Sequence, residues 1–310
     1  MTAAAVTSSR PNQNSHARRI AVIALHAFTQ LMRMKVFYFL MIFAVIALGS
    51  NFFDLPQHSG PETMGLNVLR AIKSWSLGTM TLFSVVLGIV ATALLLPKDV
   101  EDRTLYTILA KPVPRLDYLA GKLFGVLLLV GVSLALMDLL MLAVLQVRVS
   151  LFMAQVDDLA TAGEAAARVA ALRAELLTNG PDWSLQGAVF AVFLRASIMA
   201  SLALFISTFS SSTLFTSMVS FLIYFIGHFQ ADARAVLFHS EAGGTGWVER
   251  AVALVISLVL PDFQLFNVID EVLQGVAMPL GILAKLTGLA LFYAGFYLLA
   301  SWYIFAEKEF

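Results

Sequence analysis

Three ionisable residues interrupt long apolar runs of the chain, where they could do chemistry inside a membrane. They are Asp138, Arg195 and Lys285. A charge at the centre of a bilayer costs about 2.5–3.5 kcal/mol on insertion scales, so we expect these side chains to face other protein segments and to find partners there. A carboxylate and a guanidinium can form an ion pair, or they can offer a polar contact to a transported molecule.

Asp138 and Arg195 are predicted to be partners. Asp138 lies nine residues before Val147, where the third apolar run ends, and Arg195 lies ten residues after Leu185, where the fourth begins. On consecutive antiparallel helices these offsets give the two charges similar depth. Their ion pair could lock the helices together or could lie on a translocation path. Lys285 either extends to the headgroup region or contacts an anionic lipid or substrate.

A charged segment between the second and third apolar runs could bind a soluble partner. It reads LPKDVEDRTLYTILAKPVPRLDYLAGKLFG, residues 96–125. Leu105, Ile108 and Leu109 have the i, i+3, i+4 spacing of one apolar helix face, and prolines end the helix after them. A soluble protein that binds a short helix joined closely to two membrane helices could move those membrane helices. The alternative is a simple connector at the membrane surface.

The chain lacks the residue patterns of an enzyme or a metal site. Cysteine is absent, and the five histidines have no metal-binding spacing. The ATP-binding pattern G-x-x-x-x-G-K-[ST] does not occur, and the formal net charge of zero gives no reason to expect nucleic acid as a partner. We therefore predict no catalytic residue, no metal ligand and no cofactor on this chain.

The composition is typical of an integral membrane protein. Hydrophobic residues make up 59% of the chain and charged residues 13%, with a mean hydropathy of +0.84, whereas soluble proteins carry about 25% charged residues. The apolar runs are continuous, near the roughly 20 residues of a spanning helix, and lack the alternation of a β-barrel. We predict an all-α polytopic membrane protein with six spans, Val36–Phe53, Trp75–Leu96, Leu123–Val147, Leu185–Phe209, Leu214–Phe229 and Pro279–Phe305.

Two segments at the N-terminus precede these spans. Residues 1–17 are polar and are expected to form a disordered tail, whereas residues 18–310 form one membrane domain. Arg18–Met34 is predicted to be an amphipathic helix in the interface plane. Its polar stripe consists of Arg19, His26, Gln30 and Arg33.

Two further segments are predicted on the outer side. Ala251–Leu260 is too short to cross a bilayer, and with the residues after it we expect a re-entrant or interfacial helical hairpin. Residues 148–184 are predicted to be a partly helical insert outside the membrane. This insert could bind an external, periplasmic partner, or it could be an inert cap.

Lysine and arginine are denser on the side of the two termini. That side includes the loop 98–122 with its five basic residues, whereas the opposite side has Arg70 and Lys73 in a short loop and other cations in much longer ones. The bias predicts that both termini and the loop 98–122 face the cytosol of a multi-pass protein in the inner (plasma) membrane.

The layout resembles an ABC-2 type permease, the membrane subunit of an ATP-driven exporter. The loop EDRTLYTILAKPVPRLDYLAGKLFG is similar to that family's pattern of an acidic residue, a short helix and a segment leading into the third span. The amphipathic helix before the first span, the segment LPDFQLFNVID and the ending WYIFAEKEF are similar too. The likeness covers nearly the whole chain except residues 1–17 and 148–184.

The resemblance implies how the chain would be driven. In that family the loop between the second and third spans contains a coupling helix that docks on a separate P-loop ATPase, which binds ATP and magnesium. Here that helix would be Glu101–Ala110, with Glu101, Asp102, Arg103, Leu105, Tyr106, Ile108 and Leu109 as its coupling residues. The resemblance also implies a second permease subunit, either identical or related.

Other functions remain open from the sequence. One is a secondary transporter or a membrane-embedded enzyme, although such a carrier needs several interior carboxylates or broken helices, and Asp138 stands alone. Another is a permease that moves no substrate and instead transmits force to an outer partner. Since the spans are apolar, a lipid, a hydrophobic drug or a lipid-linked molecule is a better expectation for a substrate than a bare ion.

Overall fold

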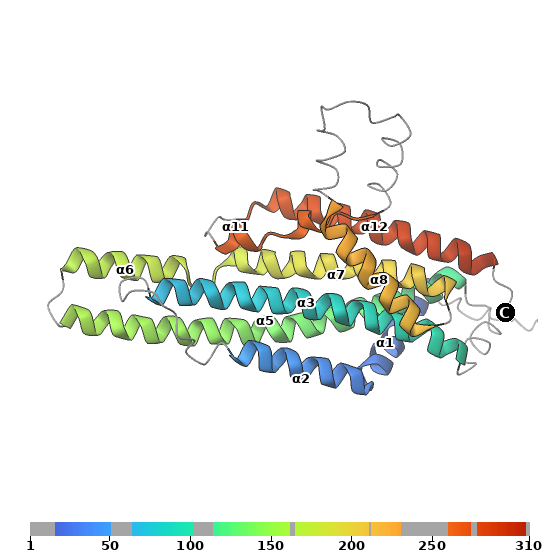
Figure 1. The fold of residues 1–310 in the computed structure, drawn as a ribbon, viewed down its shortest axis with the longest axis horizontal. Helices are drawn as coiled ribbons and strands as arrows, with labels where there is room; N and C mark the ends of the chain where they lie inside the picture. Colours follow the sequence, from blue (N-terminus) through green and yellow to red (C-terminus); the bar gives the residue numbers. More distant parts are fainter. Residues whose placement is uncertain are drawn as a thin grey trace, which may run out of the picture.

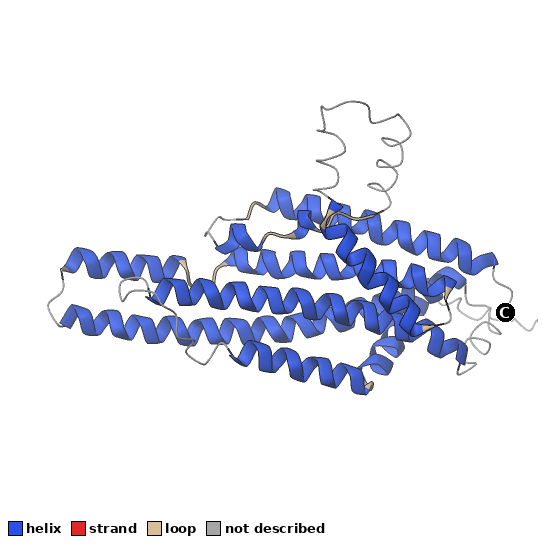
Figure 2. Cartoon of the chain, in the orientation of Figure 1, coloured by secondary structure: helices blue, strands red, loops and turns tan. Residues whose placement is uncertain are grey.

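The computed structural model describes residues 16–50, 64–101, 114–161, 165–210, 212–230, 260–273 and 278–307. Within these ranges the regular structure is helical and contains no strand (Figure 2). The all-α class predicted from the apolar runs is therefore confirmed.

The elements follow the apolar runs of the sequence closely. In chain order they are α1 (His16–Met32), α2 (Lys35–Gly49), α3 (Met64–Glu101), α5 (Arg115–Thr161), α6 (Ala166–Thr178), α7 (Trp183–Phe209), α8 (Thr213–His228), the 3-10 turn η2 (Gln264–Phe266), α11 (Ile269–Leu273) and α12 (Leu280–Glu307). Figure 1 shows α3, α5, α7 and α12 running side by side along the longest axis of the molecule.

Four helical stretches are long and apolar enough to cross a bilayer. They are Asn67–Leu95, Arg115–Thr161, Ala166–Phe209 and Leu280–Glu307. The pair α1 and α2 bends by 70° and would be a fifth span if it is taken as one, whereas α8 has only 16 residues. Length and composition thus support a multi-pass protein with four or five spans, and the prediction of six is not confirmed. The predicted hairpin segment at 251–259 lies outside the described residues.

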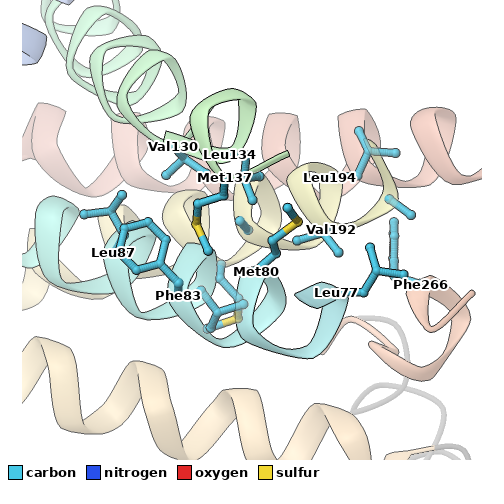
Figure 3. Close-up of a cluster of buried hydrophobic side chains, with 14 of the residues drawn as sticks. Leu77, Met80, Phe83, Leu87, Val130, Leu134, Met137, Val192, Leu194 and Phe266 are labelled. Atoms are coloured by element: carbon cyan, nitrogen blue, oxygen red, sulfur yellow. The ribbon is translucent and has the colours of Figure 1, made fainter. Parts of the chain in front are cut away.

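Helix α7 is the centre of the bundle because it is apolar on nearly every side. Most of its residues are buried, and α3, α5, α8 and α12 all contact it. Figure 3 shows how side chains from three helices and η2 meet in this core, among them Met80 and Phe83 of α3, Met137 of α5, Val192 of α7 and Phe266. A helix that is apolar all round needs such neighbours on every face.

Many hydroxyl groups in this core donate to carbonyls of their own helices, although Thr216 Oγ1 of α8 has no partner among the described residues. Thr92 Oγ1 donates to the Gly88 carbonyl at 2.7 Å, and Ser133 Oγ donates to the Leu129 carbonyl at 2.8 Å. Without such a bond, a buried hydroxyl would cost a few kcal/mol in apolar surroundings. The sequence can therefore place serine and threonine in spanning helices without opening a polar gap.

Helix α5 is much longer than the predicted third span. It has 47 residues, so at about 1.5 Å per residue it extends for about 70 Å, against roughly 30 Å for the hydrocarbon core of a bilayer. Its last turns pack against α6 through the buried Val156, Val169 and Leu176. We call this pair of segments, residues 148–161 and 166–178, the outer hairpin; it forms the left end of the molecule in Figure 1.

Candidate coupling site

The predicted coupling helix itself lies almost entirely outside the described residues. This holds for Asp102, Arg103, Leu105, Tyr106, Ile108 and Leu109, whereas Glu101 is the last residue of α3. The structure does describe where the chain re-enters the bundle after this loop, at Arg115, the first residue of α5. The contacts of that first part of α5 are therefore the contacts through which a push on the loop would reach the membrane helices.

A buried carboxylate at the start of α5 holds the N-terminal helix. Asp117 is 3% exposed, and both of its carboxylate oxygens lie 3.0 Å from His16 Nδ1. Arg19 Nε lies 3.2 Å from Asp117 Oδ2. The first turn of a helix favours a negative side chain because its backbone N–H groups are unsatisfied there. Asp117 thus joins the first turns of α1 and α5.

Two glycines continue the same face of α5 and allow close approach of α1. Gly121 and Gly125 follow Asp117 at four-residue intervals, so all three lie on one side of the helix. A Cβ atom on Gly121 would be 2.7 Å from Ile23 Cβ, and one on Gly125 would be 2.6 Å from Ala27 Cβ. Such close helix contact through small residues is typical of membrane proteins. The apolar face of α1 is therefore covered by α5.

The opposite side of this segment holds the end of the last helix. Arg115 Nη1 donates to the carbonyl oxygens of Phe305 at 2.7 Å and of Ala306 at 2.6 Å. The last carbonyls of a helix have no partner within it and carry partial negative charge, so a guanidinium is well placed there. Tyr118 is fully buried and stacks on Phe305, with ring centroids 6.1 Å apart.

Together these contacts make a mechanical connection, which we call the loop-side joint. It consists of the start of α5 with α1 on one face and the end of α12 on the other; its members are His16, Arg19, Ile23, Ala27, Arg115, Asp117, Tyr118, Gly121, Gly125, Phe305 and Ala306. Its charged groups hold one another in place, and its chemistry is that of packing and fixed ion pairs. Any displacement of the loop end of α5 must carry α1 and α12 with it or break these contacts.

The predicted ion pair between Asp138 and Arg195 is not formed. Asp138 Oδ1 accepts a hydrogen bond from Gln186 Nε2 at 3.1 Å, and Arg195 Nη2 donates to the Phe263 carbonyl at 3.1 Å. Gln186 and Arg195 both lie on α7, nine residues apart, which is about 13 Å along a helix. The depth argument failed because α5 continues to Thr161, so Val147 does not mark its outer end.

Arg195 instead positions the segment that follows residue 259. Its side chain is 4% exposed and holds Phe263, whose own N–H donates to the Gly227 carbonyl of α8 at 3.2 Å. A Cβ atom on Gly227 would be only 2.5 Å from the Phe263 ring, so the close approach requires glycine. Gln264 Nε2 also donates to the His228 carbonyl at 2.7 Å. These contacts tie Pro261–Phe266 to α7 and α8.

The remaining predicted charge, Lys285, is exposed on α12 five residues after that helix begins. This location fits a side chain that extends toward headgroups. Arg70 and Lys73, expected in a loop, belong to α3, where Lys73 is buried and Arg70 Nε donates to Asn179 Oδ1 at 3.3 Å. In the described parts of the chain, histidine and acidic side chains form no group that could hold a metal ion.

Apart from Arg19, which belongs to the predicted polar stripe, the sequence analysis did not identify the residues of the loop-side joint as candidates. Gly121 and Gly125 form a G-x-x-x-G pattern at the start of an apolar run, which is a recognised signal for helix contact in membranes and could have pointed to them. Asp117 had no comparable signal. Its partners His16 and Arg19 lie about 100 residues earlier in the chain, and no local pattern connects the two segments.

Comparison with known proteins adds the family. Residues 21–233 match the family described as ABC-2 family transporter protein, which covers more than half of the chain and extends from α1 to just beyond α8. A separate comparison with curated proteins finds no match. The matched region contains the loop, the glycine contacts between α1 and α5, and the outer hairpin, whereas His16 and Arg19 precede it.

Proposed function

Because the chain belongs to the ABC-2 family of transporter proteins, we propose that this membrane permease is the subunit through which an ATP-driven exporter moves its substrate. The proposal places it in the inner (plasma) membrane with both termini and the loop 98–122 in the cytosol. Permeases of this family normally work with an ATPase partner, and the sequence has no ATP-binding motif of its own. ATP and magnesium would therefore bind to a separate P-loop subunit, and a second permease subunit would complete the membrane part.

The loop-side joint is the observation that carries this proposal. A partner ATPase that closes on ATP would push the segment Glu101–Ala110, and the push would reach α5 at Arg115. Asp117, Gly121 and Gly125 would pass the movement to α1, and Arg115 would pass it to α12. Packed helices change position as units, so the two permease subunits would rock and alternate their access to the two sides.

The first experiment tests the docking of the ATPase. The permease is co-expressed with a candidate P-loop ATPase from the same genome, and the complex is purified through a tag on the permease. Glu101, Arg103 and Leu105 are changed singly, the last to Asp. We expect each change to reduce the amount of co-purified ATPase and to reduce transport. Arg173→Gln in the outer hairpin is the control and should leave both unchanged. Normal complex formation and flux in all three loop variants would contradict the proposal.

The second experiment separates docking from transmission. Asp117→Asn leaves the proposed coupling helix Glu101–Ala110 unchanged, so the ATPase should still co-purify at the wild-type amount. If the joint transmits the push, ATP hydrolysis should continue while transport per ATP falls. A variant that transports normally despite a destabilised joint would show that the movement takes another route.

A second function is favoured by one observation, the unbroken course of α5 from the loop-side joint to the outer hairpin. Such a helix could transmit force to a partner outside the cell membrane without moving a substrate. Replacing the outer hairpin between Ser150 and Asp182 by a short flexible linker distinguishes the two. An exporter should retain part of its flux, whereas a force-transmitting permease should lose all activity of the complex while its ATPase still binds.

A further inference from the structure

The polar stripe of α1 has no role in the loop-side joint apart from Arg19. Its other members, His26, Gln30 and Arg33, line an open hollow of about 610 Å³ in the corner where α1 bends into α2. Thr29 and Lys35 complete its polar wall. We call this space the corner hollow. Its position lies on the loop side of the bundle, because Leu94, close to the end of α3, also lines it.

Among the residues that the structure describes, the lining of the corner hollow carries cationic side chains and no acidic one. Residues 16–50 contain four lysine and arginine residues and not one aspartate or glutamate. The side chains of Arg33 and Lys35 are exposed and form no ion pair with the residues that the structure describes. Gln30 Oε1 is buried there without a hydrogen-bond partner. These groups would be satisfied by an anion that also offers a donor or a bridging water.

An apolar crevice leads directly out of the corner hollow. It is lined by Leu40 of α2, Val90 of α3 and Leu129 of α5 among others, and it shares Met34, Val36 and Leu94 with the hollow. Its volume of about 10 Å³ has no room for an acyl chain, but the surface of α2 exposes Phe39, Ile42 and Phe43. A polar hollow beside an exposed apolar helix matches a molecule that has an anionic head and a hydrocarbon tail. A free anion would use the hollow alone and leave these apolar side chains uncovered.

We propose that the corner between α1 and α2 binds an anionic phospholipid of the surrounding bilayer. Its phosphate lies among Arg33, Lys35 and His26, and an acyl chain lies along the exposed apolar side chains of α2. The 70° bend brings the polar stripe of α1 to the depth at which α2 begins, and headgroup phosphates occupy that depth. This inference does not depend on the ATPase, so it stands or falls separately from the proposed function.

The expected strength follows from the two cations. Each lysine or arginine near an anionic membrane surface contributes about a fivefold gain in binding, so the pair Arg33 and Lys35 contributes roughly thirtyfold. This preference should appear as selective retention of phosphatidylglycerol over phosphatidylcholine, since the two lipids differ in net charge and can share the same acyl chains.

Native mass spectrometry of the purified full-length chain measures this directly. Dioleoyl-phosphatidylglycerol or dioleoyl-phosphatidylcholine is titrated into the detergent solution, and the first binding event is quantified. We expect at least tenfold tighter binding of phosphatidylglycerol. In the double variant Arg33→Gln, Lys35→Gln that advantage should be lost. The matched control Arg148→Gln, Arg168→Gln removes two cations from the outer hairpin and should stay within twofold of the wild type.

Competition experiments identify the source of the phosphate, and further substitutions keep the proposal testable if the double variant misfolds. Glycerol phosphate and inorganic phosphate are added as competitors; if either displaces the lipid at equal concentration, the site binds a free anion and the lipid proposal is wrong. Met34→Trp adds bulk to the wall of the hollow beside α2 without changing charge, and it should weaken lipid binding. Should the double variant fail to fold, Lys35→Gln alone should weaken binding about fivefold, and Lys35→Arg should restore it.

Equal losses in the Arg33, Lys35 variant and in the control would show that only overall charge matters and would overturn the proposal. The same holds if phosphatidylcholine binds as tightly as phosphatidylglycerol.

Discussion

The loop-side joint and the outer hairpin lie at opposite ends of α5 and are held together in different ways. At the joint, Asp117 is buried and its oxygens face two cationic or protonatable groups, and two glycines bring α1 into backbone contact. At the outer hairpin, the ion pair between Arg173 and Asp157 is exposed, with 49% and 61% of the two side chains accessible. One end is fixed by contacts with two other helices, whereas the other is a pair of helices with four buried apolar side chains, Val149, Val156, Val169 and Leu176.

The difference shows where this protein can tolerate change. Removing one partner of a buried carboxylate leaves an unpaired polar group in apolar surroundings, while an exposed ion pair is screened by water and contributes little. We therefore expect substitutions at the joint to affect both stability and coupling, and we expect matched substitutions in the hairpin to affect neither. The predictions below test this contrast in order of decreasing effect.

The largest effect is expected for Gly125→Ala. The new Cβ would lie 2.6 Å from Ala27 Cβ and 2.8 Å from the Ala24 carbonyl oxygen, so α1 must move away from α5. Overpacking of this kind costs about 2–3 kcal/mol. Gly131→Ala is the control, because its nearest neighbour is a Phe193 ring atom at 3.5 Å, and there alanine should stabilise the helix by about 0.5–1 kcal/mol. Thermal unfolding followed by circular dichroism measures the stability of both variants. If the two substitutions change the unfolding free energy equally, α1 and α5 are not in close contact at Gly125.

Asp117→Asn is expected to follow, with a loss of about 2 kcal/mol. The amide keeps the shape of the side chain but not its charge, so Arg19 and His16 lose their anionic partner. The value stays below that of a fully buried pair because the side chain of His16 is 71% exposed. Thermal unfolding of Asp117→Asn and of Asp157→Asn, its counterpart in the hairpin, measures this loss of stability. If the two variants lose the same unfolding free energy, the two ends of α5 do not differ as we expect.

Arg115→Gln should cost about 1 kcal/mol. The variant loses charged hydrogen bonds to the Phe305 and Ala306 carbonyls at the end of α12, although glutamine can still donate one bond. Hydrogen exchange at the last turn of α12 is the appropriate measurement, since local opening there should increase before the whole bundle unfolds. Unchanged exchange in that turn would mean that α12 is held by its apolar contacts alone.

Arg173→Gln should have the smallest effect, at most about 0.5 kcal/mol. Its ion pair with Asp157 is exposed on both sides, and salt screens it further. Unfolding at low and high salt should differ little between the variant and the wild type. A loss comparable to that of Asp117→Asn would show that the hairpin is as firmly built as the joint.

Much of the fold was predictable because helices follow apolar runs. The run Leu185–Phe209 became α7, Trp183–Phe209, whose start is set by the side chain of Asp182 accepting from the Trp183 N–H at 2.7 Å. The length of α5 was not predictable in this way. Past Val147 the sequence turns polar on one face while keeping helical spacing, so hydropathy marks the end of the membrane span and not the end of the helix.

The partners of charged residues were less predictable than the helices. Counting residues from the ends of the apolar runs predicted an ion pair between Asp138 and Arg195. In the structure, Asp138 instead accepts a hydrogen bond from Gln186, and Arg195 donates to a backbone carbonyl. A span boundary uncertain by a few residues shifts depth by several ångströms, which is larger than a hydrogen bond. The contact of Asp117 with α1 depends on the three-dimensional arrangement, which no local spacing encodes.

The single helix α5 also sets a scale for motion. Over its length of about 70 Å, a rotation of about 5° around the fixed first turns displaces the far tip by roughly 6 Å, as much as a full helical turn. A rearrangement too small to be noticed at the loop-side joint would thus be easily measured at Thr161. If the proposed complex contains two copies of the chain, spin labels near that residue in each copy should report its opening and closing with the best signal available anywhere on the helix.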